Sequence, residues 1–201
     1  MFDAFGSLLM VICLAYGLGS IPFGLIITKL AGEGDIRQVG SGNIGATNVL
    51  RTGNKKLALA TLFFDAGKGA IAVLLSIQLT DSALTALAAV LVVTGHCFPI
   101  WLKFQGGKGV ATSLAAIATL DIRIGLVFVF VWLITALVSR YSSLSALLAM
   151  FACGLGSFFL LDDGMAQIAI SLMGLLVWSR HQANIGRLLN GTETKIGASH
   201  T

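Results

Sequence analysis

The polar segment at residues 35–51, DIRQVGSGNIGATNVLR, carries the residue types best suited to binding an anion. It is basic and rich in glycine, although long apolar segments flank it. Its glycines allow backbone turns that other residues resist, and a short helix is expected over 46–51 with Gly53 as its cap. A glycine turn before a helix N-terminus presents free N–H groups to a phosphate. A flexible loop between membrane helices is the alternative for this segment alone.

The side chains of the segment strengthen the phosphate interpretation. Arg37 and Arg51 add positive charge, and the guanidinium fork of Arg51 matches phosphate oxygens. The glycines also fit G-x-G-x-x-G, but no strand precedes them and no βαβ unit surrounds them, which excludes a dinucleotide fold. The candidate binding residues here are Gly40, Ser41, Gly42, Asn43, Gly45, Thr47, Asn48 and Arg51.

A second glycine turn, FQGGKG at 104–109, also opens an apolar run, and it contains Gly106, Gly107 and Lys108. It is not a P-loop, because that motif needs Ser or Thr after the lysine and this chain has glycine there. His96 lies shortly before the turn. A lone histidine near an apolar end is more often a packing residue than a catalyst, and both roles stay open.

The last polar segment, 180–195, places His181, Asn184 and Arg187 at i, i+3 and i+6, followed by Glu193. If the last helix continues, the first three share one polar face. The alternative is an ordinary basic tail attracted to anionic lipid.

Asp65 and Lys68 form an ionisable pair inside an apolar stretch. They are three residues apart and share a helix face. Such a pair within a membrane helix indicates a functional site, whereas a pair in the headgroup layer is the alternative. The three cysteines have no disulfide spacing and are expected to be small buried residues: Cys13, Cys97 and Cys153.

Composition predicts an integral membrane protein. The chain has 201 residues, of which 56% are hydrophobic and 11% charged, and its mean hydropathy is +0.91. A soluble domain carries roughly 25% charged residues. The first apolar stretch, 5–30, is too long for the core of a signal peptide and is expected to be a retained helix. We expect a single transmembrane domain over 1–201.

Charge distribution predicts an all-α fold of seven transmembrane helices. Reading 110–140 as two crossings broken at 121–123 puts every Lys and Arg except Arg123 on one side. By the positive-inside rule, the N-terminus is then outside (periplasmic) and the C-terminus cytoplasmic. The other predicted helices cover about 5–30, 57–79, 84–102, 143–161 and 165–180.

This topology brings the three polar segments to one face as a basic basin rich in donors. Such a basin suits phosphate-bearing substrates, and apolar walls between helices suit a fatty chain. An anion transporter or channel is the rival, but it predicts binding near the bilayer midplane and paired halves. A purely structural scaffold leaves the glycine motifs unexplained.

Four motifs resemble one enzyme family: GSIPFG at 19–24, GSGNIGATNVLR at 40–51, GHCFPIWLKFQGGKGVAT at 95–112 and NIGRLLNGTETKIG at 184–197. They look like the bacterial acyl-phosphate-dependent glycerol-3-phosphate acyltransferases of the PlsY family. The resemblance implies seven transmembrane helices and transfer of an acyl group from acyl phosphate to glycerol 3-phosphate, giving lysophosphatidate and phosphate. It implies no metal and no cofactor.

On that hypothesis, the 40–48 loop binds one phosphate, and Arg51 and Lys108 supply charge. Asn184 and His181 position glycerol 3-phosphate, with His181 or the departing phosphate taking the proton. Ser41 as an acyl-enzyme nucleophile is a further alternative. Besides the two substrates we expect only membrane lipid as partner, with no nucleic acid and no obligatory protein, in the bacterial cytoplasmic membrane with the site facing the cytoplasm. The predicted catalytic residues are Ser41, Arg51, Lys108, His181 and Asn184; the predicted binding residues are Gly40, Gly42, Asn43, Gly45, Thr47, Asn48, His96, Gly106, Gly107, Arg187 and Glu193.

Overall fold

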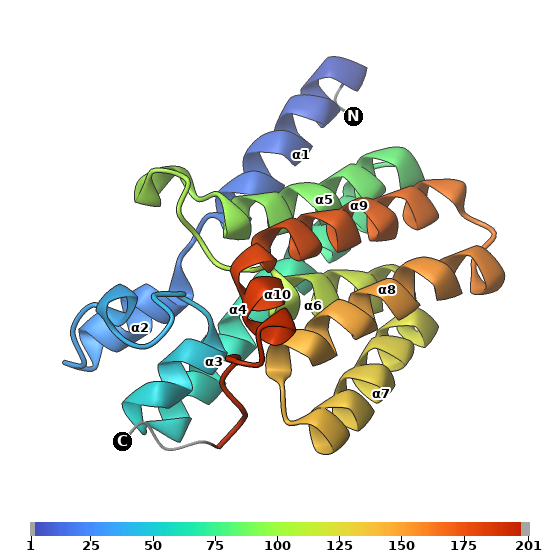
Figure 1. Cartoon of the computed structure of the whole chain (residues 1–201). Coiled ribbons are helices and arrows are strands. Elements are labelled where there is room, and N and C mark those ends of the chain that lie inside the picture. Colours follow the sequence, from blue (N-terminus) through green and yellow to red (C-terminus); the bar gives the residue numbers. More distant parts are fainter. Residues whose placement is uncertain (1–2, 198–201) are drawn as a thin grey trace.

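The computed structural model describes residues 3–197, and every regular element in that range is helical. Ten α-helices and three short 3-10 helices alternate with tight turns (Figure 1). The α-helices are α1 (Ala4–Gly19), α2 (Phe23–Leu30), α3 (Ala46–Val49), α4 (Lys55–Leu79), α5 (Ser82–Cys97), α6 (Val110–Leu120), α7 (Ile122–Ser139), α8 (Ser142–Leu160), α9 (Gly164–Arg180) and α10 (Gln182–Leu189); the 3-10 helices are η1 (Ile36–Gln38), η2 (Leu50–Thr52) and η3 (Ile100–Leu102).

Four helical stretches are long and apolar enough to cross a membrane: α4, α5 continued by η3 (82–102), α7 and α8. The bent pair α1 and α2 makes a fifth span if both are counted together. Helices α6 and α9 are apolar but shorter, with 11 and 17 residues. The protein is therefore an all-helical membrane protein with four or five long apolar spans, and the seven predicted crossings stay a prediction.

The first predicted helix, 5–30, is in fact two helices that meet at an angle of 40°. The break falls at Pro22, which has no backbone N–H and cannot continue the hydrogen-bond ladder of α1. Figure 1 shows α1 projecting from the bundle, whereas α2 lies near the loop that follows it. The prediction of one continuous helix was wrong, because the chain changes direction at Pro22 instead of accommodating the proline within a single helix.

Glycines allow the closest helix contacts of the bundle. A Cβ on Gly19 of α1 would collide with the backbone of Val92 in α5, and one on Gly69 of α4 would collide with the backbone of Thr112 in α6. Small residues let membrane helices approach in this way, where packing replaces the hydrophobic drive. The contact at Gly69 fixes α4 against α6, which carries one wall of the site described below.

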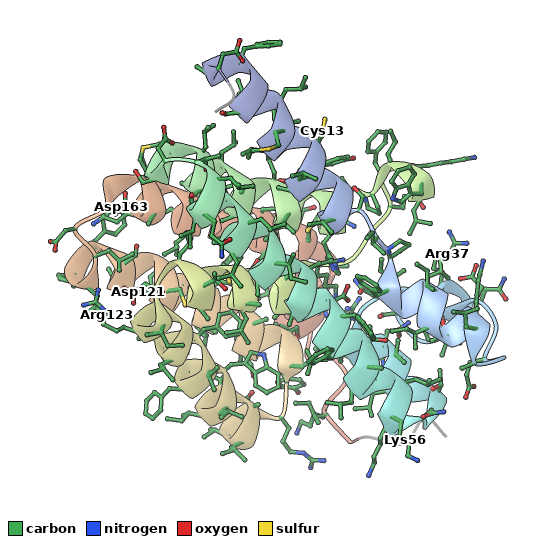
Figure 2. All side chains as sticks on the ribbon, turned by 180° about the vertical axis from the view of Figure 1, so that it is seen from behind. Cys13, Arg37, Lys56, Asp121, Arg123 and Asp163 are labelled. Atoms are coloured by element: carbon green, nitrogen blue, oxygen red, sulfur yellow. The ribbon has the colours of Figure 1, made fainter. Side chains whose placement is uncertain are left out.

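Acidic turns lie at one end of the molecule and basic loops at the other. Figure 2 shows Asp121, Arg123 and Asp163 on one side, and Arg37 and Lys56 on the opposite side. Asp121 and Asp163 act as N-caps, since their carboxylates accept backbone N–H groups of α7 and α9. This separation agrees with the charge asymmetry that the sequence predicted.

The cysteines only partly follow prediction. Cys97 and Cys153 are buried as expected, but Cys13 is exposed. Only Val11, Ala15 and Gly19 of α1 are buried, so Cys13 lies on the face of α1 that meets no other helix. A residue type that favours the interior is thus placed outside because the helix has a single packing face.

Candidate active site

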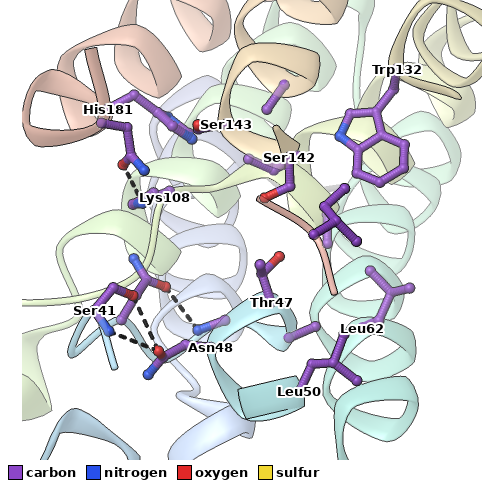
Figure 3. A pocket seen from close by; sticks show the side chains of 18 of the residues that line it. Ser41, Thr47, Asn48, Leu50, Leu62, Lys108, Trp132, Ser142, Ser143 and His181 are labelled. Carbon is purple, nitrogen blue, oxygen red and sulfur yellow. Dashed lines mark hydrogen bonds between the residues drawn. The ribbon is translucent and has the colours of Figure 1, made fainter. Parts of the chain in front are cut away.

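A cavity of about 620 Å³ lies where the three polar segments meet. Its lining includes residues of the loop after α2, the turn before α6, and α10 with the chain that follows it. Figure 3 shows Ser41, Lys108 and His181 on one side of the cavity, and Leu62 and Trp132 on the other. The cavity therefore has a polar end and an apolar end.

Asn48 organises the loop at the polar end. Its side chain is buried, and its Nδ2 donates to the carbonyls of Ile36 (3.0 Å) and Val39 (2.9 Å). Its Oδ1 accepts the backbone N–H of Ser41 (3.0 Å) and the Ser41 hydroxyl (3.2 Å). The predicted short helix is confirmed as α3 and η2, and Gly53 ends it with φ +85°. The single buried side chain of Asn48 thus joins α3 to residues 36–41 of the loop that precedes it.

Gly40 is required by conformation and by space. Its φ is +55°, and a Cβ there would collide with the side chains of Arg51 and Asn48. The Asn43 carboxamide oxygen accepts the Gly45 N–H at 2.8 Å, which fixes the next turn. These contacts place Ser41, Thr47 and Arg51 on the cavity wall.

The Gly106–Gly107 turn supports the cavity from behind. The N–H groups of Gly106 and Gly107 donate to the carbonyls of Cys97 (3.1 Å) and His96 (3.0 Å). Arg180 donates to the carbonyls of both glycines, at 3.2 Å each. The turn is thus held from two sides immediately before Lys108.

Lys108 lines the cavity, and its ammonium donates to the side-chain oxygen of Asn184. The pKa of Lys108 is lowered to about 8, mainly by burial and in part by neighbouring cations, whereas the charge of Glu193 opposes the shift. The lysine therefore titrates just above neutral pH, and an arriving anion favours its charged form.

His181 caps α10 and is buried. Its Nδ1 lies 2.7 Å from the carbonyl of Val177, which can only accept, so Nδ1 carries the proton. Burial lowers the pKa of His181 to about 4. At neutral pH the ring is uncharged, and its Nε2 is available as a hydrogen-bond acceptor.

Glu193 ties the C-terminal chain to the helices. Its Oε1 accepts from Asn184 Nδ2 (2.6 Å) and from the Ser143 hydroxyl (2.8 Å), and its Oε2 accepts from Arg187 Nε (2.6 Å). Burial alone would raise the pKa of Glu193, but these hydrogen bonds outweigh it and hold the pKa below its usual value. The last helix does not continue as the prediction required, because α9 ends at Arg180 and α10 begins at Gln182, yet the three predicted residues all line the cavity: His181, Asn184 and Arg187.

The apolar end of the cavity comes mostly from α4, α6 and α7, whose apolar side chains the sequence analysis did not single out. Ser143 was also missed, because it lies 50 residues before its partner Glu193 and belongs to no motif. Lys195 was counted only as part of a basic tail, yet it adds a further cation to the lining. The apolar lining residues include Leu50, Leu62, Leu114, Phe128, Val129, Trp132 and Leu133.

All five predicted catalytic residues line the cavity, and so do most of the predicted binding residues. Gly40, Gly42, Gly106 and Gly107 do not; they shape the loops that carry the lining residues. Within residues 3–197, no group of three or more His, Cys, Asp or Glu side chains is arranged to hold a metal ion.

A helical bundle with long apolar spans and a cavity that is basic at one end and apolar at the other defines an integral membrane protein with a site for amphiphilic anions. The family model for glycerol-3-phosphate acyltransferase matches residues 9–191. A glycerol-3-phosphate acyltransferase of Brucella anthropi (strain ATCC 49188) is 53% identical over 199 residues, covering 96% of each chain. One of Brucella ovis is 53% identical over 183 residues, covering 91% of this chain and 90% of the relative.

Two solved structures are similar in fold. Both are crystal structures of PlsY, an integral membrane glycerol 3-phosphate acyltransferase. The glycerol 3-phosphate form has a TM-score of 0.91 and 39% identity, and the lysophosphatidic acid form a TM-score of 0.89 and 37% identity; each comparison covers 96% of both chains. The chain belongs to the glycerol-3-phosphate acyltransferase family and is a membrane enzyme of the PlsY type.

Proposed function

We propose that the enzyme transfers a fatty acyl group from acyl phosphate to the sn-1 hydroxyl of glycerol 3-phosphate, giving lysophosphatidate and inorganic phosphate. The observation that carries the proposal is the two-ended cavity. Arg51, Lys108, Arg187 and Lys195 line it together with only two acidic residues, Asp65 and Glu193. This excess of positive charge suits two phosphate groups held side by side, while the apolar end suits an acyl chain.

The proposal assigns the two phosphates to different parts of the polar end. The 40–48 loop, with Ser41 and Thr47, binds one phosphate, and Arg51 and Lys108 balance the combined negative charge. Asn184, held by Lys108 and Glu193, positions glycerol 3-phosphate with His181. The PlsY structures that are named for glycerol 3-phosphate and lysophosphatidic acid support the same acceptor and product here.

The proposed reaction does not require strong acid–base or nucleophilic catalysis by any single side chain. An acyl phosphate is already activated, so alignment of the hydroxyl and stabilisation of the oxyanion supply most of the catalysis. The hydroxyl oxygen forms the new C–O bond, and the C–O bond to phosphate breaks. The hydroxyl proton passes to His181 Nε2 or directly to the departing phosphate, whose second pKa is about 6.

Ser41 does not need to be a nucleophile in this scheme. Its hydroxyl lies 3.2 Å from the Asn48 amide oxygen, which is not a base. We expect Ser41→Ala to lower affinity while leaving measurable turnover. An acyl-enzyme route through Ser41 would instead require Ser41→Ala to abolish transfer completely.

We further propose that residues 1–201 act as one transmembrane domain of the bacterial cytoplasmic membrane, with seven crossings and the site facing the cytoplasm. The opposite placement of the acidic turns and the basic loops supports this orientation. Single cysteines at Lys56 and Asp163, introduced into a variant without native cysteines, test it. Labelling by an impermeant maleimide in intact cells is expected at position 163 only, and labelling at position 56 would contradict the orientation.

The decisive experiment measures phosphate release by the purified protein in detergent, with palmitoyl phosphate and glycerol 3-phosphate. Release that requires both substrates and is matched by lysophosphatidate supports the proposal. Lysophosphatidate formed only from a thioester donor would overturn the acyl phosphate assignment. Transport of glycerol 3-phosphate across liposomes without turnover would replace the enzyme reading with the transporter reading.

A further inference from the structure

A buried charged cluster lies at the wall of the cavity, which Asp65 and His96 help to line, and the proposed chemistry gives this cluster no role. Asp65 and Lys68 occupy one face of α4, with Lys68 Nζ 2.9 Å from Asp65 Oδ1 and side chains only 4% and 2% exposed. His96 of α5 completes the cluster, with Nδ1 3.5 Å from the same carboxylate oxygen. Ionisable groups within membrane helices are costly to keep, which indicates that they have a task.

The first contact of the cluster reaches the break between α1 and α2. Lys68 Nζ donates to the carbonyl of Ile21 at 2.9 Å, next to Pro22. Beyond the break, Gly24 approaches the backbone of Ile44 so closely that a Cβ would collide with it. Lys68 therefore helps to set the direction of α2, on which the Ser41 loop packs.

The second contact reaches the Gly106–Gly107 turn. A Cβ on Gly107 would collide with His96 Nε2, so the imidazole lies directly against this glycine. The Gly107 N–H also donates to the His96 carbonyl at 3.0 Å. Both the backbone and the ring of His96 thus fix the residue that precedes Lys108.

A third contact joins the cluster to α6, which begins directly after Lys108 and Gly109. The Thr112 hydroxyl donates to the backbone carbonyl of Asp65 at 2.9 Å. Apart from the ion-pair contacts, neither Asp65 Oδ1 nor His96 Nδ1 has a hydrogen-bond partner of good geometry among residues 3–197. The carboxylate therefore faces the ring nitrogen directly, and it favours the tautomer that carries its proton on Nδ1.

We propose that Asp65, Lys68 and His96 are positioning residues that hold the two loops of the active site in register. Asp65 orients His96, His96 holds Gly107, and Gly107 sets the position of Lys108, while Lys68 anchors the break that directs α2. The inference rests on the proposed role of Lys108 in charge balance. Without the cluster, Lys108 and the Ser41 loop lose their fixed separation, and the rate falls because alignment is lost.

Two neutral pairs test the step from Asp65 to His96. Asp65→Asn/Lys68→Met and Asp65→Leu/Lys68→Met both remove the buried charges, which avoids an unpaired ion. Only the first keeps an acceptor facing His96. The assay measures lysophosphatidate formation. We expect the kcat of Asp65→Asn/Lys68→Met to be about fivefold higher than that of Asp65→Leu/Lys68→Met, because the two variants differ by one hydrogen bond to His96. Equal kcat values in folded proteins would overturn the proposal.

A size exchange tests the step from His96 to Gly107 and serves also if the neutral pairs do not fold. Gly107→Ala is expected to lower kcat/KM for glycerol 3-phosphate by about tenfold, because the methyl group displaces the turn. His96→Ala opens the space, so the double variant should regain about threefold over Gly107→Ala. Gly154→Ala is the control, because a Cβ there meets nothing within 4 Å in the described structure. If the decreases in kcat/KM of the two single variants simply multiply in the double variant, His96 and Gly107 are not coupled and the proposal is wrong.

The same series separates this inference from the donor assignment. If the unmodified protein shows no turnover with palmitoyl phosphate, the donor proposal fails. The variants are then compared by how strongly glycerol 3-phosphate protects them against thermal unfolding. A difference between the two neutral pairs in that assay supports the cluster, and equal protection overturns it.

Discussion

The lowered pKa of Lys108 leads to a specific pH dependence of catalysis. A lysine with a pKa of about 8 carries its charge below that pH and loses it above. Because kcat/KM reports groups of the free enzyme, it should fall as Lys108 deprotonates. The protonated fraction drops from about nine-tenths at pH 7 to about one-tenth at pH 9, so kcat/KM should fall about tenfold.

The assay is lysophosphatidate formation at low substrate concentration between pH 6.5 and 9.5. Lys108→Arg should have a lower rate but no alkaline fall in this range, because a guanidinium stays protonated. Lys103→Arg is the matched control, since Lys103 is exposed and does not line the cavity. A flat profile for the unmodified protein, or an unchanged fall in Lys108→Arg, would show that another group limits the reaction.

Three further predictions concern stability and loop geometry. Glu193→Gln places an amide N–H₂ against Arg187 Nε and removes the ion pair. Because Arg187 is 39% exposed, we expect thermal unfolding to show a free energy of unfolding lower by only about 1–2 kcal/mol, and a larger decrease for Glu193→Ala. His181 has a pKa of about 4 in the folded protein against 6.5 in the unfolded chain, so its contribution to stability is complete above pH 6.5 and is lost as the pH falls toward 4. At pH 5 the free energy of unfolding should be about 2 kcal/mol lower than at neutral pH, and His181→Gln should remove this part of the pH dependence. Gly40→Ala and Gly53→Ala both replace glycines with positive φ, and each should lower the free energy of unfolding by about 1–2 kcal/mol. Only Gly40→Ala should raise KM for glycerol 3-phosphate, because only its Cβ meets Arg51. Equal KM values for the two variants would contradict this description of the loop.

The sequence was informative where local rules govern the chain. The glycine turns, the short helix ended by Gly53, and the division of 110–140 into α6 and α7 all follow from backbone preferences and charge placement. The placement of Asn184 and Arg187 of α10 at the same cavity followed from helix periodicity. Each of these features depends on residues close together in the chain.

The parts that could not be predicted depend on contacts distant in sequence. Pro22 could have been accommodated within one helix, and only the packing of α2 against the loop and α4 decides that it breaks the chain there. Asp65 and Lys68 were left open between a functional pair and a pair in the headgroup layer. The structure buries them because His96 and Ile21 approach from two other segments. Trp132 carried no signal, since an apolar wall residue resembles any other residue of an apolar helix.

The apolar end of the cavity is not sealed. Leu62 and Leu133 line it, yet they are 44% and 49% exposed, and their neighbours Phe63 and Phe130 on the same helices are even more accessible. Moving a 16-carbon chain into water costs about 12 kcal/mol at roughly 0.8 kcal/mol per methylene, which is a factor of almost a billion in partitioning. A fatty product that leaves through this side avoids that barrier and enters the lipid phase directly. With acyl phosphate as the proposed donor, the other product is phosphate, which is small and hydrated and would leave through the polar end, so that the two products of one turnover enter different phases.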